Sequence, residues 1–138
     1  MIVVDTNVVA YLLLPGDQTE AARRTFARDP AWAAPALWRS ELRHVLALYL
    51  RQQHLALADA VAVQAEAEAL FVGREYAVES AEVLALAAQS GRSAYDCEFV
   101  AVARALGVPL VTSDRQLLGS FPAIAVALRE YGAGAPGA

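Results

Sequence analysis

Two short, uninterrupted apolar segments near opposite ends of the chain constrain its fold most strongly. Residues 2–4 (Ile-Val-Val) lead directly into Asp5, and residues 108–111 (Val-Pro-Leu-Val) lead through two hydroxyl residues into Asp114. A strand that is buried on both faces is apolar without alternation, which is typical of a parallel sheet covered by helices. Ligands bind at the carboxyl ends of such strands, so the two aspartates are expected at a functional edge of the sheet.

The sequence between these segments alternates helical patterns with short extended ones. Residues 32–34 are expected to form a strand, residues 71–78 a short extended piece, and residues 123–128 a last apolar piece. Apolar spacing bounded by Pro, Gly, Ser and Asp predicts helices over residues 6–14, 35–52, 58–70, 80–89 and 93–106, with a short one from Asp114. Another helix is expected to reach about Arg28, with Asp17 or Thr19 as its cap. Strands that alternate with helices predict an α/β domain whose central, mostly parallel sheet is flanked by helices.

Composition agrees with one packed domain. The chain has 138 residues, of which 57% are hydrophobic and 19% charged, and no linker divides it. We expect a domain over residues 1–131 and a flexible tail over residues 132–138, which are rich in Gly and Ala. The apolar stretches are too short to cross a membrane, and residues 2–5 read as a strand rather than a signal peptide, so we expect a cytoplasmic location. The single cysteine, Cys97, excludes an intramolecular disulfide and a cysteine-based zinc site.

The charge pattern narrows the chemistry. The net charge of −4 is unusual for a nucleic-acid-binding protein, but it equals four acids discussed below, whose charge bound cations would offset. All eleven basic residues are arginines, and the absence of lysine excludes a lysine-bearing phosphate loop and Schiff-base chemistry. A GC-rich genome also favours arginine over lysine, so the arginines are only weak evidence for phosphate binding.

Two further carboxylates interrupt the apolar faces of predicted helices. Glu41 lies on one helical face with Leu37 and Val45, and Asp96 lies on another with Phe99. A charged side chain within an apolar face costs free energy unless something compensates it. Both positions are therefore candidates for a function.

Each acid also has a structural interpretation that the sequence leaves open. Asp5 and Asp114 stand where a helix N-cap is favoured. Asp96 follows Ser93 by three residues, which is the spacing of a capping box, and it would lie near the positive end of a helix dipole. For Glu41, a helix over residues 35–52 offers no cap or helix-end role.

The conjunction of four acids favours a metal site. Asp5, Glu41, Asp96 and Asp114 could meet at one edge of the sheet, where their mutual repulsion would require divalent cations. Magnesium binds through a few carboxylates and retained waters, which leaves room for a phosphate oxygen and an attacking water. Neighbouring polar groups that could hold the carboxylates in position are Thr6, Asn7, Thr112 and Ser113. Candidate RNA contacts are Arg39, Arg43 and Arg115, with a solvated helix face as the alternative for the first two.

The ordered motifs resemble those of PIN-domain proteins. They are Asp5-Thr6-Asn7 at the start, Glu41 in a helix, Asp96 within Ser-x-Tyr-Asp-Cys-Glu-Phe-Val-Ala-Val-Ala, and Thr112-Ser113-Asp114 after a strand. Their order, and the length of the chain, are similar to those of VapC-type toxins of toxin–antitoxin pairs. The resemblance extends from Ile2 to about Leu128, and its specificity lies in the ordered set, because each motif alone is short and common.

The resemblance implies a PIN-like three-layer fold and an endoribonuclease that depends on Mg²⁺ or Mn²⁺. In that family the four acids bind the metal and act in catalysis, and a metal-activated water hydrolyses the RNA. The resemblance also implies a homodimer that is inhibited by a cognate antitoxin. Arg115 and Gln116 stand where some relatives carry a further acid, which leaves the choice between one and two metals open.

Two other functions remain open at this point. A metal-dependent phosphohydrolase with an aspartyl nucleophile usually has a second aspartate two positions on and a lysine, whereas this chain has Asn7 and no lysine. A non-catalytic binding module that keeps the fold is opposed by the four retained acids, although an acid set does not establish turnover.

Overall fold

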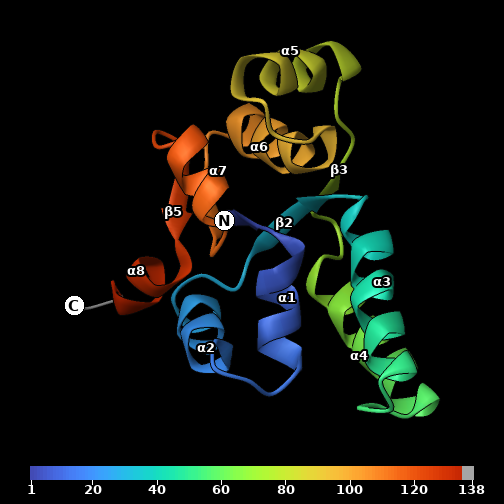
Figure 1. Cartoon of the computed structure of the whole chain (residues 1–138). Coiled ribbons are helices and arrows are strands. Elements are labelled where there is room, and N and C mark those ends of the chain that lie inside the picture. The colour runs from blue at the N-terminus through green and yellow to red at the C-terminus, as the bar shows by residue number, and fades with distance from the viewer. Residues whose placement is uncertain (135–138) are drawn as a thin grey trace.

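In residues 1–134, which the computed structural model describes, five strands form a single sheet (Figure 1). The strands are β1 (Ile2–Val4), β2 (Trp32–Pro35), β3 (Glu75–Tyr76), β4 (Leu110–Thr112) and β5 (Ala125–Ala127). All neighbouring strands are parallel, and their order across the sheet is β3-β2-β1-β4-β5. The parallel α/β domain expected from the sequence is confirmed.

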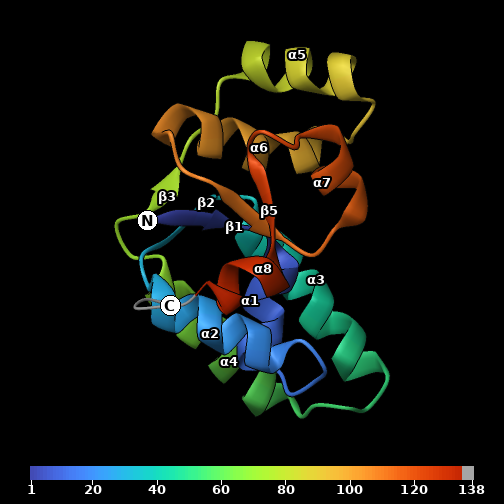
Figure 2. The same ribbon diagram turned by 90° about the vertical axis from the view of Figure 1, so that its left-hand side faces the viewer.

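Helices cover both faces of this sheet. They are α1 (Thr6–Leu13), α2 (Thr19–Arg28), α3 (Trp38–Arg51), α4 (Leu57–Leu70), α5 (Ser80–Ser90), α6 (Ala94–Leu106), α7 (Arg115–Ser120) and α8 (Leu128–Ala133). α5 and α6 lie on one side of the sheet, whereas α1 to α4 and α8 lie on the other (Figures 1 and 2). β1, β2 and β4 are buried along their whole length, which explains why their sequences, apart from Thr112, are apolar without alternation.

The strand register brings the carboxyl ends of β1 and β4 level with each other. Val4 pairs with Val111, so the next residues along the two strands, Asp5 and Thr112, stand side by side. The Asp5 amide donates to the carbonyl of Val111 at 3.4 Å. Segments more than a hundred residues apart in the chain therefore share one edge of the sheet.

Among the element boundaries that differ from the sequence prediction are the starts of α3 and β4. α3 begins at Trp38 rather than Pro35, because Pro35 is the last residue of β2 and pairs there with Tyr76. The prediction that Glu41 has no helix-end role is therefore wrong, since Glu41 lies in the first turn of α3. β4 begins at Leu110 rather than at residue 108, because the amide at 108 still bonds to the end of α6.

The C-terminal end contains α8, a helix that the sequence analysis did not predict. It includes Gly132, which had been assigned to the tail, and it packs on α2. Arg28 donates from Nη1 to the carbonyl of Tyr131 at 2.9 Å, and its guanidinium lies 4.0 Å from the centre of that ring. A Cβ at Gly132 would lie 3.0 Å from the Ala21 carbonyl oxygen, so close packing favours glycine there. The predicted tail beyond Gly134 lies outside the described residues, and the domain boundary stays a prediction.

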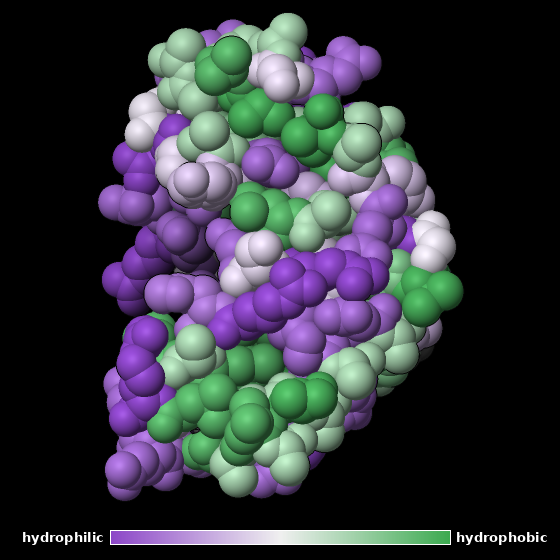
Figure 3. Space-filling model, turned by 90° about the vertical axis from the view of Figure 1, so that its right-hand side faces the viewer, coloured by the Kyte–Doolittle hydropathy of each residue, from purple (hydrophilic) through white to green (hydrophobic). Residues whose placement is uncertain are grey.

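A groove between α3 and α4 leaves apolar side chains on the surface. Figure 3 shows them gathered over the lower part of the molecule, below a band of polar residues. The groove has a volume of about 400 Å³, and Leu57 and Val61 in its lining are 68% and 61% exposed. Within the part of the chain that the structure describes, no helix is both long and apolar enough to cross a membrane.

Candidate active site

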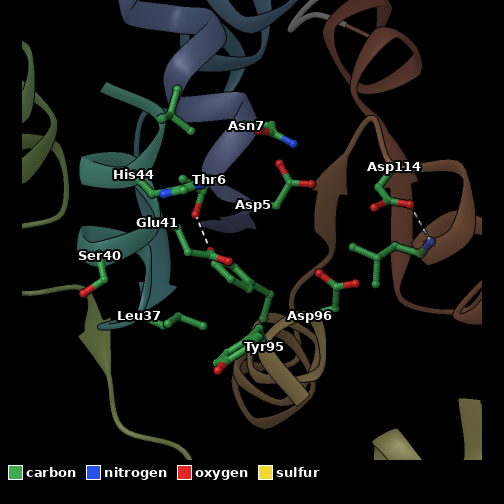
Figure 4. Close-up of a pocket in the computed structure, with 13 residues that line it drawn as sticks. Asp5, Thr6, Asn7, Leu37, Ser40, Glu41, His44, Tyr95, Asp96 and Asp114 are labelled. Carbon is green, nitrogen blue, oxygen red and sulfur yellow. Dashed lines mark hydrogen bonds between the residues drawn. The ribbon is translucent and has the colours of Figure 1, made fainter. Parts of the chain in front are cut away.

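The four acids predicted from the sequence line a single pocket. Asp5, Glu41, Asp96 and Asp114 border a cavity of about 440 Å³ at the carboxyl ends of β1 and β4. The carboxylates of Asp5, Asp96 and Asp114 face a shared space, while Glu41 stands at the other side of Asp5 (Figure 4). Residues from four separate parts of the chain are thus brought to one place by the sheet edge and by α3 and α6.

Each of these acids lies at the N-terminal end of a different helix. Asp5 is the N-cap of α1 and Asp114 is the N-cap of α7, while Glu41 and Asp96 lie in the first turns of α3 and α6. The positive ends of four helix dipoles therefore point toward the carboxylates and offset part of their repulsion. The cap interpretation and the functional one are compatible, because the same geometry that caps the helices gathers the negative charge.

Asp5 is the most deeply buried acid of the group, with 8% of its surface exposed. Its Oδ1 accepts from the Val8 amide at 3.2 Å, and its Oδ2 accepts a short hydrogen bond from the Thr112 hydroxyl. Burial raises the pKa of Asp5 to about 6, with a further rise from the charges of Asp114 and Asp96 that these hydrogen bonds only partly oppose. Asp5 is thus held rigidly in a place where its negative charge is unfavourable unless a cation joins it.

Glu41 is half-buried and is held by one neighbour. The Thr6 hydroxyl donates to Glu41 Oε1 at 2.7 Å (Figure 4). Partial burial raises the pKa of Glu41, and the charges of Asp96 and Glu98 raise it further against the effect of the Thr6 hydrogen bond. A carboxylate whose pKa is raised accepts a proton more readily, which suits a group that activates water.

Asp96 and Asp114 are fixed by their helix ends. The Asp96 amide donates to Ser93 Oγ at 3.0 Å, which is one half of the expected capping box. Asp114 Oδ1 accepts from the amides of Gln116 and Leu117, at 2.8 and 3.2 Å. Partial burial and the charge of Asp114 raise the pKa of Asp96. Among residues 1–134, Asp114 Oδ2 makes no hydrogen bond and remains available toward the pocket.

The supporting residues behave in two ways. Thr6 and Thr112 bind Glu41 and Asp5 directly, as described above, and Thr112 Oγ1 also accepts from the Asp114 amide at 3.0 Å. Asn7 lines the pocket beside Asp5 and keeps its side chain exposed (Figure 4). Ser113 Oγ lies 3.2 Å from the Tyr11 hydroxyl, so it anchors a neighbouring side chain, and no hydrogen bond joins its side chain to the four acids within residues 1–134.

The chemistry of this donor set fits a hard divalent cation. The pocket lining contains carboxylate, hydroxyl and amide oxygens and no arginine, and His44 is its only side chain that can carry a positive charge. Among residues 1–134, no three His, Cys, Asp or Glu side chains are grouped closely enough to hold a metal ion between them. Magnesium commonly uses one or two carboxylates together with waters and substrate phosphate oxygens, so three preformed protein ligands are not required.

The predicted RNA-contacting arginines lie outside the pocket lining. Arg39 is held by Glu75 at 2.7 Å and by Glu68 at 2.9 Å, so its charge is satisfied within the protein. Arg43 lines the apolar groove between α3 and α4. Arg115 is exposed and directly follows Asp114, which leaves it the nearest of the three in sequence to an acid of the pocket.

The sequence did not predict three polar residues of the pocket wall, which are Ser40, His44 and Tyr95. His44 is exposed and lies one helical turn after Glu41. Ser40 precedes Glu41, and Tyr95 precedes Asp96 with 63% of its surface exposed. Their position beside the two helical acids is the signal that could have revealed them, because residues near a first-turn acid share its end of the helix.

A parallel α/β domain with four such acids around the carboxyl ends of its central strands defines the class of protein. The sequence matches the PIN domain family over residues 2–121, and the chain belongs to this family. It is also similar to Ribonuclease VapC3 of Pyrobaculum aerophilum, with 30% identity over 126 residues that cover 89% of this chain and 96% of that protein.

Proposed function

We propose that this protein is a metal-dependent endoribonuclease and the toxin of a toxin–antitoxin pair. The observation that carries the proposal is the convergence of Asp5, Asp96 and Asp114 on a shared space in which the pKa values of Asp5 and Asp96 are raised. Similarity to a protein named as a ribonuclease of the VapC type supports RNA as the substrate. The resemblance to toxins supports a cognate antitoxin, a homodimer and a cytoplasmic location.

Asp5, Asp96 and Asp114 would hold Mg²⁺ or Mn²⁺, with Glu41 close by. The metal would supply Lewis acidity, stabilising charge on the phosphate and lowering the pKa of a bound water. The four helix N-termini would keep the acids in place before the substrate arrives. Arg115 would contact the RNA backbone next to the site, since it is exposed beside Asp114.

Glu41 would orient the attacking water and accept its proton at Oε2, since Thr6 already occupies Oε1. The raised pKa of Glu41 brings its proton affinity closer to that needed near neutral pH. Water, rather than the RNA 2′-hydroxyl, would be the nucleophile. The products would then carry a 5′-phosphate and a 3′-hydroxyl.

The antitoxin would inhibit by placing an Arg or Lys side chain among the acids. A pocket that accepts divalent cations also accepts a basic side chain through charge-assisted hydrogen bonds. Alanine at every basic residue of the antitoxin tail should therefore relieve inhibition of RNA cleavage. Full inhibition by that variant would contradict this part of the proposal.

The Glu41→Gln variant tests the catalytic function. The substitution keeps the size of the side chain and removes a charge whose pKa shift shows that it is unfavourable, so the variant should melt no lower than the wild type. Cleavage of total cellular RNA with Mn²⁺ should fall by about a hundredfold or more, and growth arrest on expression should disappear. Glu66→Gln, an exposed acid of α4, is the matched control.

The outcomes separate the proposal from its main rival, a PIN-like module that binds without cleaving. The absence of three preformed ligands among residues 1–134 is the observation that favours the rival. Wild-type protein that leaves RNA intact with Mg²⁺ and with Mn²⁺ would support the module. A folded Glu41→Gln protein that cuts at the wild-type rate would end the claim that Glu41 is catalytic.

A further inference from the structure

A second cleft opens beside the pocket that contains the four acids. It lies between α1, α3 and the loop that joins α1 to α2, and it has a volume of about 340 Å³. Asn7 and Val45 line both cavities, so the cleft continues the pocket along α1 and α3, which lie side by side (Figure 1). We call it the α1–α3 cleft. Whatever binds in the pocket can extend into it without crossing the protein.

The walls of the α1–α3 cleft include two tyrosines. Tyr11 comes from α1 and Tyr49 from α3, and both are half-buried. The Tyr11 hydroxyl is fixed by Ser113 Oγ at 3.2 Å, and the Tyr49 ring packs against His54 in an edge-on arrangement with 6.3 Å between ring centres. Each of these contacts restrains a ring that lines the cleft, and aromatic rings of this kind stack on flat ligands.

The same cleft contains amide groups with unused hydrogen-bonding capacity. Gln18 is the N-cap residue of α2, yet its side chain makes no cap hydrogen bond. Its Oε1 is enclosed and has no hydrogen-bond partner within residues 1–134. An enclosed polar atom without a partner costs free energy, and rotation of the amide would present a donor and an acceptor to a group in the cleft. Asn7 adds a second amide at the mouth.

The charge of the lining excludes a phosphate as the occupant. No arginine or histidine lines the α1–α3 cleft, and Asp17 adds a carboxylate. A volume of about 340 Å³ is near the lower end of the roughly 300–1,000 Å³ range for small-molecule sites, so it suits a single ring system. Two tyrosines can stack on a flat, neutral ring, and two amides can form hydrogen bonds with polar groups on its edge.

We propose that the α1–α3 cleft takes one unstacked base of the RNA, adjacent to the phosphodiester that is cut. This inference rests on the proposed ribonuclease function and adds a specificity subsite to it. Single-stranded RNA is recognised by stacking of splayed bases on aromatic side chains and by hydrogen bonds to their edges. Tyr11 and Tyr49 would provide the stacking, and the Gln18 amide would read the base edge, as Asn and Gln amides read adenine. The enzyme would then prefer particular bases at one position beside the cut.

The first experiment measures base binding without any phosphate or metal. Neutral nucleosides (adenosine, guanosine, cytidine and uridine) are titrated at millimolar concentration into the ¹⁵N-labelled wild-type protein. The expected result is a set of amide shifts at Gly16, Asp17, Gln18 and Tyr49 that differ among the four nucleosides. Gln18→Ala should remove the differences, whereas Gln89→Ala, an exposed glutamine of α5, should keep them. Shifts that are absent from the cleft, or equal for all four nucleosides, would overturn the inference.

The second experiment sequences the cut ends produced from total cellular RNA with Mn²⁺. Wild type and Gln89→Ala should show a base preference at one flanking position, and Gln18→Ala should flatten it. Tyr49→Ala should lower cleavage roughly 5- to 150-fold, the range for loss of one base-stacking contact. If Tyr49→Ala melts much lower than wild type, Gln18→Ala alone decides, because its side chain supports no helix cap.

The two experiments separate failure of the subsite from failure of the ribonuclease proposal. Cleavage with a base preference that Gln18→Ala and Tyr49→Ala leave unchanged would overturn the subsite and keep the enzyme. Base-selective nucleoside shifts in the cleft of a protein that does not cut RNA would support base binding there and overturn the ribonuclease function.

Discussion

Two groups of acids lie around opposite sides of α3, and they differ in what balances their charge. On one side, Glu41 joins Asp5, Asp96 and Asp114 around the pocket, whose lining contains no arginine. On the other side, Glu75 and Glu68 hold Arg39, which comes only two residues before Glu41. We call the second group the Arg39 cluster.

The pKa shifts of the two groups have opposite signs. The Arg39 guanidinium, with help from Trp38 Nε1, lowers the pKa of Glu75 below its usual value. Burial and mutual repulsion raise the pKa values of Asp5, Glu41 and Asp96. The Arg39 cluster is therefore complete within the protein, whereas the pocket carries negative charge that an external cation would neutralise. Perturbed acids mark a functional site only when nothing in the protein already pairs with them.

The largest expected effect is the loss of cleavage on removing one pocket charge. Asp96→Asn should reduce RNA cleavage about a hundred- to a thousandfold, or roughly 2.7–4 kcal/mol, as for loss of a positioned electrostatic group. Glu75→Gln, in the Arg39 cluster, should retain most of the wild-type rate. Initial rates on the same RNA with Mn²⁺ give the comparison. Equal losses in the two variants would remove the functional distinction between the groups.

The next effect is on the pH dependence of folding without metal. Between about pH 4 and 6, folded Asp5 holds a proton that the unfolded chain has released, so stability should fall as pH rises through this window. The shift from 3.8 to about 6 corresponds to roughly 3 kcal/mol. Asp5→Asn should remove this loss, as measured by urea unfolding in a metal chelator.

Glu75 should show the reverse behaviour, which makes it the internal control. The pKa of Glu75 is lowered in the folded state. Glu75 therefore stabilises the fold at neutral pH, and this stabilisation is lost as the pH falls through the pKa of the folded state. Glu75→Gln should therefore lower the free energy of unfolding at neutral pH and leave it nearly unchanged at pH values below the lowered pKa of Glu75. Identical pH profiles for wild type and Asp5→Asn would show that Asp5 carries no raised pKa.

A slightly smaller effect is expected from metal on the melting temperature. Mg²⁺ or Mn²⁺ at a hundred times its Kd would stabilise the folded state by about 2.7 kcal/mol, which is roughly 8 °C for a domain of this size. Asp114→Asn should lose most of this gain, and Arg39→Leu should keep it. A wild-type melting temperature that does not respond to millimolar Mn²⁺ would count against the metal site.

The smallest effect is expected within the Arg39 cluster. Arg39→Leu leaves two partly buried carboxylates and their bonded neighbours without a cation, so the melting temperature should fall by a few degrees. Arg51→Leu, an exposed residue in the last turn of α3, is the matched control and should change it little. If both variants melt alike, the Arg39 cluster contributes no measurable stability.

The sequence by itself determined the parallel α/β class and the two strand-end acids. β1 and β4 are short apolar runs, which identify them as buried parallel strands from the sequence alone. A polar residue that follows such a strand lies at the carboxyl edge of the sheet, where ligands bind. Asp5 and Asp114 were therefore placed correctly from local pattern alone. The position of Asp96 in the first turn of a helix followed from the Ser93 capping signal, which is also local.

Only the tertiary structure decided which residues contact the charged side chains of the helices. The sequence predicts Arg39 as an RNA contact, whereas in the fold its guanidinium binds Glu75, which is 36 residues away in the chain. α8 forms although Gly132 disfavours a helix, because α2 offers a close surface to this glycine. The late start of α3 depends on the pairing of Pro35 with β3. Local periodicity reports which face of an element is apolar, but free energy depends on contacts between elements, and those exist only once the chain has folded.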